Sequence, residues 1–311
     1  MRTKLLTRIY RKLKNYEWEK LPINFKGGKT GLMLFLTLYS EVVNNTHARN
    51  LSTRILFSLV RDNTTARHTI LTGKLGMAWA LYFLCQKEIL EKNESLEGIL
   101  ASIRKEFMFM YYTSPLMIVD DENLFSAGIY SLIQCSDEES LERYRLEERL
   151  INLVDECERQ LTLSIEGIWN PEDLPLSMLH SYLFFLQTCV EKKSFTYKAN
   201  LLLTQIKERY KLTQDKPLCD DYIYQILLGE EEMLIPISST DEALFELLGK
   251  IGFYSLLYNH PPLFQGALNQ ICKQHPYFLQ TANKLVIREN MSLATLCGWG
   301  YGLLLNENTC L

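Results

Sequence analysis

The chain has 311 residues, of which 47% are apolar and 23% charged, and its formal net charge is −4. This composition provides enough apolar side chains for a core and differs from that of disordered chains. The small negative charge excludes a general role in binding nucleic acids or other polyanions. The eight cysteines form no Cys-x-x-Cys pair, which favours reduced thiols and a cytoplasmic location.

The first fourteen residues contain six basic side chains and no acidic one. Within 1–20 we predict a basic amphipathic helix with an apolar face formed by Leu5, Leu6, Ile9 and Leu13. One interpretation is peripheral contact of residues 1–14 with a membrane surface or a partner. The other is an outer helix of the fold that packs through this face. Residues 1–14 lack the apolar segment of a secretory signal, and no apolar run reaches the roughly 18 residues of a transmembrane segment.

A glycine motif recurs along the chain, each time directly before a run of apolar residues. Its clearest copies have the sequence Gly-Lys-x-Gly and lie at residues 28–31, 73–76 and 249–252. Weaker copies lie at residues 126–128, 177–181 and 297–302. Most copies are about 50 residues apart, and the longest gap contains a degenerate candidate at residues 218–224.

A repeat of this length accommodates two helices and two turns. The helix after each glycine motif is apolar nearly all round, which predicts burial between neighbours. The helix that follows it has one apolar face, as in residues 95–110, 140–161 and 197–210. Sustained alternation of apolar and polar residues, the pattern of a strand, is absent. We therefore predict an all-α fold.

The arrangement that we predict is a single domain over 1–311, an α/α toroid of about six to seven helix pairs. Glycines at the start of each inner helix would let neighbouring backbones approach closely. An open solenoid is the alternative arrangement. Closure of the last pair on the first is more economical, because the last inner helix ends near residue 311 and would otherwise need a cap.

Small residues before an apolar helix, repeated about seven times, resemble the lanthionine synthetase C-like family over about residues 22–311. The last copy, SLATLCGWGYGLLL, is the most similar to that family's closing repeat. The resemblance implies an enzyme that adds a cysteine thiol of a ribosomally made precursor peptide to a dehydrated serine or threonine. It also implies a zinc ion, bound by two cysteines and one histidine, that activates the thiol.

The sequence departs from the family at the zinc ligands. Cys219 matches the first cysteine by position, but the expected Cys-His pair is replaced by Leu247 and Leu248. Leucine cannot coordinate zinc. The resemblance then implies a member without zinc or another cofactor, which binds a precursor peptide or a partner modifying enzyme in bacterial peptide maturation.

Five residues of the glycine motifs are candidates for ligand binding. Lys29, Lys74 and Lys250 occupy equivalent positions and could bind an anion together with the free N–H groups of a helix start. The alternative is that these lysines are solvated. Trp299 and Tyr301 suit peptide side chains or sugar rings, or else seal the ring of helices as wedges.

The candidates for catalysis are His180, Asp220 and Asp221. His180 could act as a general acid or base, or be a hydrogen-bonded structural histidine. The two aspartates could bind a cation, act as an acid/base pair, or cap the helix that begins at Tyr222.

Two enzymatic alternatives stay open. A glycoside hydrolase on the same scaffold would pair Asp220 or Asp221 with an acid of residues 120–122 across the cavity. An active thioether cyclase would use Cys219 with atypical zinc ligands. The sequence does not decide whether the chain is an enzyme.

Overall fold

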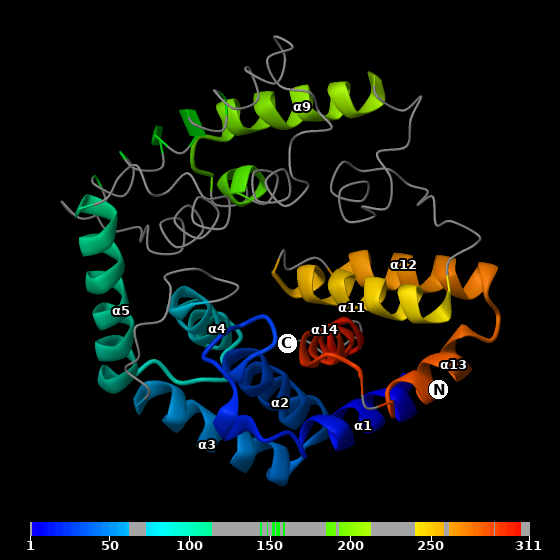
Figure 1. Ribbon diagram of the computed structural model, residues 1–311. Helices are drawn as coiled ribbons and strands as arrows, with labels where there is room; N and C mark the ends of the chain where they lie inside the picture. The colour runs from blue at the N-terminus through cyan, green and yellow to red at the C-terminus, as the bar shows by residue number, and fades with distance from the viewer. Residues whose placement is uncertain are drawn as a thin grey trace. The chain divides into compact units, whose positions relative to one another are not determined.

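The computed structural model (Figure 1) describes residues 2–61, 73–113, 185–190, 193–212, 240–257, 261–288 and 290–305, with single positions between 144 and 158. All regular secondary structure of these residues is helical, which confirms the predicted all-α class. The chain divides into two compact units. The first unit contains residues 1–106 and 232–311, and the second contains residues 107–231.

Four described helices of the first unit are buried around most of their circumference. They are α2 (Lys29–Val43), α4 (Lys74–Gln86), α11 (Asp241–Leu257) and α14 (Leu293–Leu304). Each carries a glycine motif, and each was predicted from its apolar residues to be an inner helix. Burial of apolar side chains on several sides stabilises a fold more than a single apolar stripe does. The predicted inner helices are therefore confirmed in this unit.

The helices between them are amphipathic, as predicted, although two helices rather than the predicted one separate α11 from α14. They are α3 (Thr46–Arg61), α5 (Glu94–Thr113), α12 (Pro261–Gln274) and α13 (Phe278–Leu285). Helix α3 packs on α2, and α12 packs on α11. The buried residues of α3 recur at helical spacing and form one stripe: Ala48, Leu51, Ser52, Ile55 and Leu59. In both pairs an inner helix is therefore followed by an outer helix.

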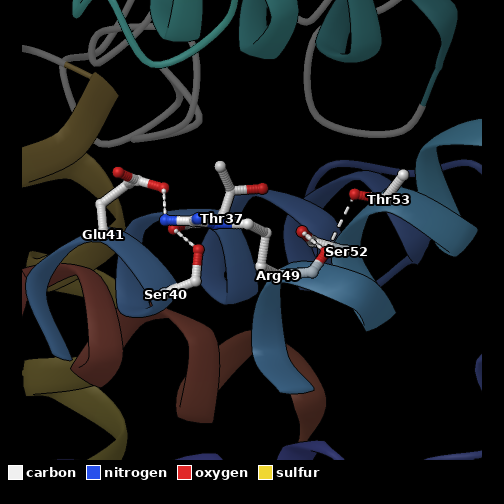
Figure 2. A network of polar contacts seen from close by, with 6 residues as sticks. All are labelled: Thr37, Ser40, Glu41, Arg49, Ser52 and Thr53. Atoms are coloured by element: carbon white, nitrogen blue, oxygen red, sulfur yellow. Dashed lines mark hydrogen bonds and ion pairs between the residues drawn. The ribbon is translucent and has the colours of Figure 1, made fainter. Parts of the chain in front are cut away.

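The turn between α2 and α3 is short because two asparagines form it. Asn44 adopts the left-handed conformation (φ 52°) that ends many helices. Asn45 caps α3, since its side-chain oxygen accepts a hydrogen bond from the Ala48 N–H at 2.9 Å. An exposed ion pair between Arg49 and Glu41 (3.1 Å) also joins the two helices (Figure 2). Such a pair contributes at most about 1 kcal/mol, so the local fold depends mainly on the caps and apolar packing.

The second unit contains α9 (Thr196–Leu212) and helical positions between 144 and 158. Lys198 of α9 pairs with Asp155 at 2.5 Å and with Glu158 at 2.8 Å. Helix α9 matches the helix predicted over 197–210, and the described positions between 144 and 158 are helical and lie within the helix predicted over 140–161.

Helix α14 packs most extensively on α11 and also packs on α2, as Figure 1 shows. Because α2 in turn packs on α4, the inner helices form a row in the order α4, α2, α14, α11. The last inner helix therefore lies against the first inner helix. This is the contact that the predicted closure requires, and a complete toroid stays a prediction.

The N-terminal helix α1 (Arg2–Leu13) packs on α14 and α13. Its apolar face is buried, and Leu5, Ile9 and Leu13 are fully buried. Arg8 donates a hydrogen bond to the Asn283 carbonyl in the last turn of α13 at 2.7 Å, and Lys12 donates to the Arg288 carbonyl just after this helix at 2.6 Å. Cations are favoured at this end of a helix dipole. The apolar face is thus used for packing, which is the second interpretation above.

Helix α1 is shorter than the predicted segment 1–20. It ends at Leu13, and a separate 3-10 turn, η1 (Trp18–Lys20), follows. The apolar face that a membrane contact of residues 1–14 would require is occupied by α13 and α14. Within the described ranges, no helix is both long and apolar enough to cross a bilayer.

Candidate functional site

The glycines of α11 and α14 bring the two helix backbones into contact. A Cβ atom on Gly298 would lie 1.9 Å from the carbonyl oxygen of Gly249, and one on Gly252 would lie 2.0 Å from that of Gly298. Real Cβ contacts are never so short, so only glycine fits at these positions. We call this contact the glycine crossing.

The glycine crossing corrects one sequence expectation, which placed each glycine motif at the start of its helix. Helix α11 begins at Asp241, about two turns before Gly249. The Thr240 hydroxyl caps it by accepting from the Ala243 N–H at 3.3 Å, and two acidic residues follow in the first turn. A side-chain cap and acidic residues in the first turn stabilise the start of a helix, so α11 begins before its glycine motif. The glycines of α11 therefore lie inside the helix, and so do those of α14, which begins at Leu293.

Helix α2 does begin at its glycine motif, with Gly28 as the N-cap. Its first N–H groups are not free to bind an anion. The N–H of Lys29 donates to the Pro22 carbonyl at 2.8 Å, and that of Thr30 donates to the Ile23 carbonyl at 3.4 Å. The Thr30 hydroxyl also donates to Ile23. Residues 21–28, which we call the Phe25 loop, therefore cover the start of α2.

Gly31 makes room for this loop. A Cβ atom at Gly31 would lie 2.2 Å from the carbonyl oxygen of Phe25. Gly31 and Gly252 are equivalent residues of two Gly-Lys-x-Gly motifs, and each one faces a backbone carbonyl. The Phe25 loop therefore approaches α2 as closely as α14 approaches α11.

The lysines of the motifs lie in different environments. Lys29 is buried and donates to the Ser58 hydroxyl of α3 at 3.2 Å. Lys74 is buried and lies 2.9 Å from both carboxylate oxygens of Glu106 on α5. Lys250 is exposed on α11. The two buried ammonium groups are thus bound by the outer helices that follow them in the chain.

Trp299 and Tyr301 are both fully buried. The indole N–H of Trp299 donates to the Phe245 carbonyl at 2.8 Å, and the hydroxyl of Tyr301 donates to the Gly31 carbonyl at 2.7 Å. Burial raises the pKa of Tyr301 well above its ordinary value, so its hydroxyl stays a donor. These side chains join α14 to α11 and to α2. They therefore act as wedges between helices, one of the two roles that the sequence left open.

Phe25 lies at the centre of an aromatic cluster that sequence reasoning did not predict. Its ring centroid is 5.1 Å from Trp79 of α4, 4.8 Å from Phe253 of α11 and 6.4 Å from Tyr301 of α14. Phe25 itself is buried. The available signal was a large apolar residue in the turn-rich sequence LPINFKGG, since such a residue needs a packing partner elsewhere.

Several predicted site residues lie outside the described residues. These are His180, Cys219, Asp220, Asp221 and the acidic residues 120–122. Leu247 and Leu248, at the positions of the family's Cys-His pair, lie in α11, and Leu248 is fully buried. In the part of the chain that the structure describes, no three histidine, cysteine or acidic side chains gather to form a metal site.

Comparisons with protein-family models, curated proteins and solved structures return no match. The described site is apolar and aromatic, and its polar groups are backbone carbonyls, helix N–H groups, the hydroxyls of Thr30 and Tyr301 and the indole N–H of Trp299.

Proposed function

We propose that this chain is an α/α toroid that binds a peptide, as a zinc-less relative of the lanthionine synthetase C-like proteins. Its ligand in this proposal is a ribosomally made precursor peptide or a segment of a partner modifying enzyme. The observation that carries the proposal is the position of Phe25, which contacts inner helices at both ends of the row in the first unit.

This position requires the row of helices to curve. Packed helices lie 8–10 Å apart, so a straight row of four would separate its end helices by roughly 25 Å or more. Phe25 lies against Trp79 of the first helix in the row and Phe253 of the last. One phenyl ring reaches both only from the concave side of a curved row. Curvature of this kind is expected of a ring of helix pairs and supports the toroid.

The Phe25 loop also indicates the kind of ligand that this concave side accepts. The loop places an aromatic ring among three others and two carbonyls against the first turn of α2. A peptide segment offers the same groups. The leucines at positions 247 and 248 favour binding over zinc-dependent thiol activation, since hydrocarbon side chains provide no ligand.

The test uses the purified full chain and fluorescein-labelled peptides encoded by short reading frames beside its gene. Anisotropy titrations are expected to show saturable binding of one peptide and none of a scrambled peptide of the same composition. Metal analysis of the same sample is expected to find far less than one zinc per chain. Absence of binding contradicts the proposal. Stoichiometric zinc that is lost in Cys219→Ala would instead support the thioether cyclase.

A further inference from the structure

We propose that the position of Phe25 is the binding position for an aromatic side chain of the incoming peptide, and that the Phe25 loop is a displaceable plug that occupies it. This inference rests on the proposed function and identifies where and how the peptide binds. It concerns only residues of the first unit.

The surrounding rings are fixed independently of Phe25. Tyr301 is fixed by its hydrogen bond to the Gly31 carbonyl at 2.7 Å, and Trp79 stacks on Phe83 at 5.3 Å. Phe25 is tilted by 36° to Trp79 and by 45° to Phe253, within the range of favourable aromatic pairs. Because these partners keep their own contacts when Phe25 leaves, the position is preformed for another aromatic ring.

The polar contacts of the loop are ones that a peptide can replace. The first turn of α2 binds the loop through the carbonyls of Pro22 and Ile23, which accept from Lys29 and Thr30. Every peptide carries equivalent carbonyls, so the donors of α2 are satisfied whichever segment is bound. Displacement therefore leaves no buried donor without an acceptor.

The loop also indicates the sequence of the peptide. Ile23 and Phe25 are both buried and are two residues apart. Both side chains enter the core, although residues 23–25 lie in a bend and a turn that a displacing peptide would also have to adopt. A displacing peptide is therefore expected to carry an aliphatic residue two positions before an aromatic one. Gly27, two residues after Phe25, adopts φ +79°, which is a left-handed conformation that favours glycine. We expect this residue to act as the hinge of the loop.

The first test uses Phe25→Ala in the full chain, with N-acetyl-L-phenylalanine amide as the probe. At a saturating probe concentration, we expect the Tm of this variant to rise by roughly 3 °C and that of the unaltered protein to stay unchanged. The matched control is Phe264→Ala, because Phe264 is fully buried against Trp299 and Gly302 of α14. The peptide-like probe is expected not to stabilise this control.

The inference is overturned if the probe does not raise the Tm of Phe25→Ala, or if it raises the Tm of both variants equally. The probe is a capped amino acid, so either result is independent of whether a precursor peptide has been found. Binding of a precursor peptide without a shift for Phe25→Ala would support the proposed function and reject the plug.

A second measurement needs no substitution and remains decisive if Phe25→Ala fails to fold. Amide hydrogen exchange followed by NMR would compare Lys29 and Thr30 with amides in the middle of α2. If the loop opens by itself, Lys29 and Thr30 exchange roughly 100-fold faster or more, and nearly independently of denaturant. If they exchange only when the whole protein unfolds, the loop is part of the core and the inference is wrong.

Discussion

The glycine crossing and the start of α2 use the same sequence motif for different neighbours. In α11, Gly252 faces the Gly298 carbonyl of another helix, and in α2, Gly31 faces the Phe25 carbonyl of a loop. The distances from an added Cβ atom are 2.0 and 2.2 Å. The motif therefore specifies that a backbone approaches the inner helix closely, and the nature of that backbone depends on the surrounding chain.

The largest effect is expected at the glycine crossing. We expect Gly298→Ala to lower the free energy of unfolding by about 3 kcal/mol or more, because two packed helices must separate to admit the methyl group. The matched control is Gly98→Ala in α5, where a Cβ atom meets nothing within 4 Å. That change is expected to raise stability by about 0.5–1 kcal/mol. Urea unfolding measures the free energy of unfolding of both variants. Similar changes for Gly298→Ala and Gly98→Ala would contradict the glycine crossing.

A smaller effect is expected at the start of α2. Gly31→Ala clashes with the Phe25 carbonyl, but a loop moves more easily than a helix, so we expect a loss of about 1–2 kcal/mol. Displacement of Phe25 should also change the fluorescence of Trp79. Gly266→Ala, with no atom within 4 Å of an added Cβ, is the control for helix propensity. A loss as large as that of Gly298→Ala would show that the loop is as rigid as the helix.

The smallest effect concerns the thiol next to the crossing. Burial raises the pKa of Cys297 far above its ordinary value of 9.0, so the folded protein keeps this proton while the unfolded chain releases it. Stability should therefore fall as pH rises above about 9, by up to about 1.4 kcal/mol per pH unit from this group. Unfolding of the protein and of Cys297→Ala at pH 7.5, 9 and 10 isolates this contribution. If the free energy of unfolding falls equally with pH in the protein and in Cys297→Ala, water reaches the Cys297 thiol in the folded state.

Much of the fold follows from residue patterns that act locally. The inner helices are apolar all round, the outer helices carry one stripe, and the glycines mark close contacts, so helix pairs are predictable. The beginning of α11 was missed because its first two turns precede the motif used to locate it. Helix caps at Thr240 and Asn45 depend on single polar side chains, which a search for apolar periodicity overlooks.

The candidate site was less predictable, because its geometry depends on contacts between distant parts of the chain. The lysines of the motifs were expected either to bind an anion or to be solvated, yet Lys29 and Lys74 are buried and bind partners on α3 and α5. Trp299 was considered for binding and is fully buried. Phe25 was overlooked because nothing near it in sequence shows that Trp79 and Phe253 come together around it.

The central claim is that the beginning of the chain lies against its last inner helix, and a disulfide tests it most directly. A Cβ atom at Gly27 would lie 3.7 Å from the Cβ of Ala294 on α14, a separation typical of disulfides. A cysteine at Gly27 is strained by its positive φ at a cost of roughly 1–2 kcal/mol, which is less than the roughly 2–4 kcal/mol that a disulfide contributes. In the double variant Gly27→Cys with Ala294→Cys, we therefore expect this bond to form in the folded protein under mild oxidation. Peptide mapping by mass spectrometry should recover the linked pair. Two thiols that stay reduced in the folded protein, or that pair with other cysteines, would contradict the account.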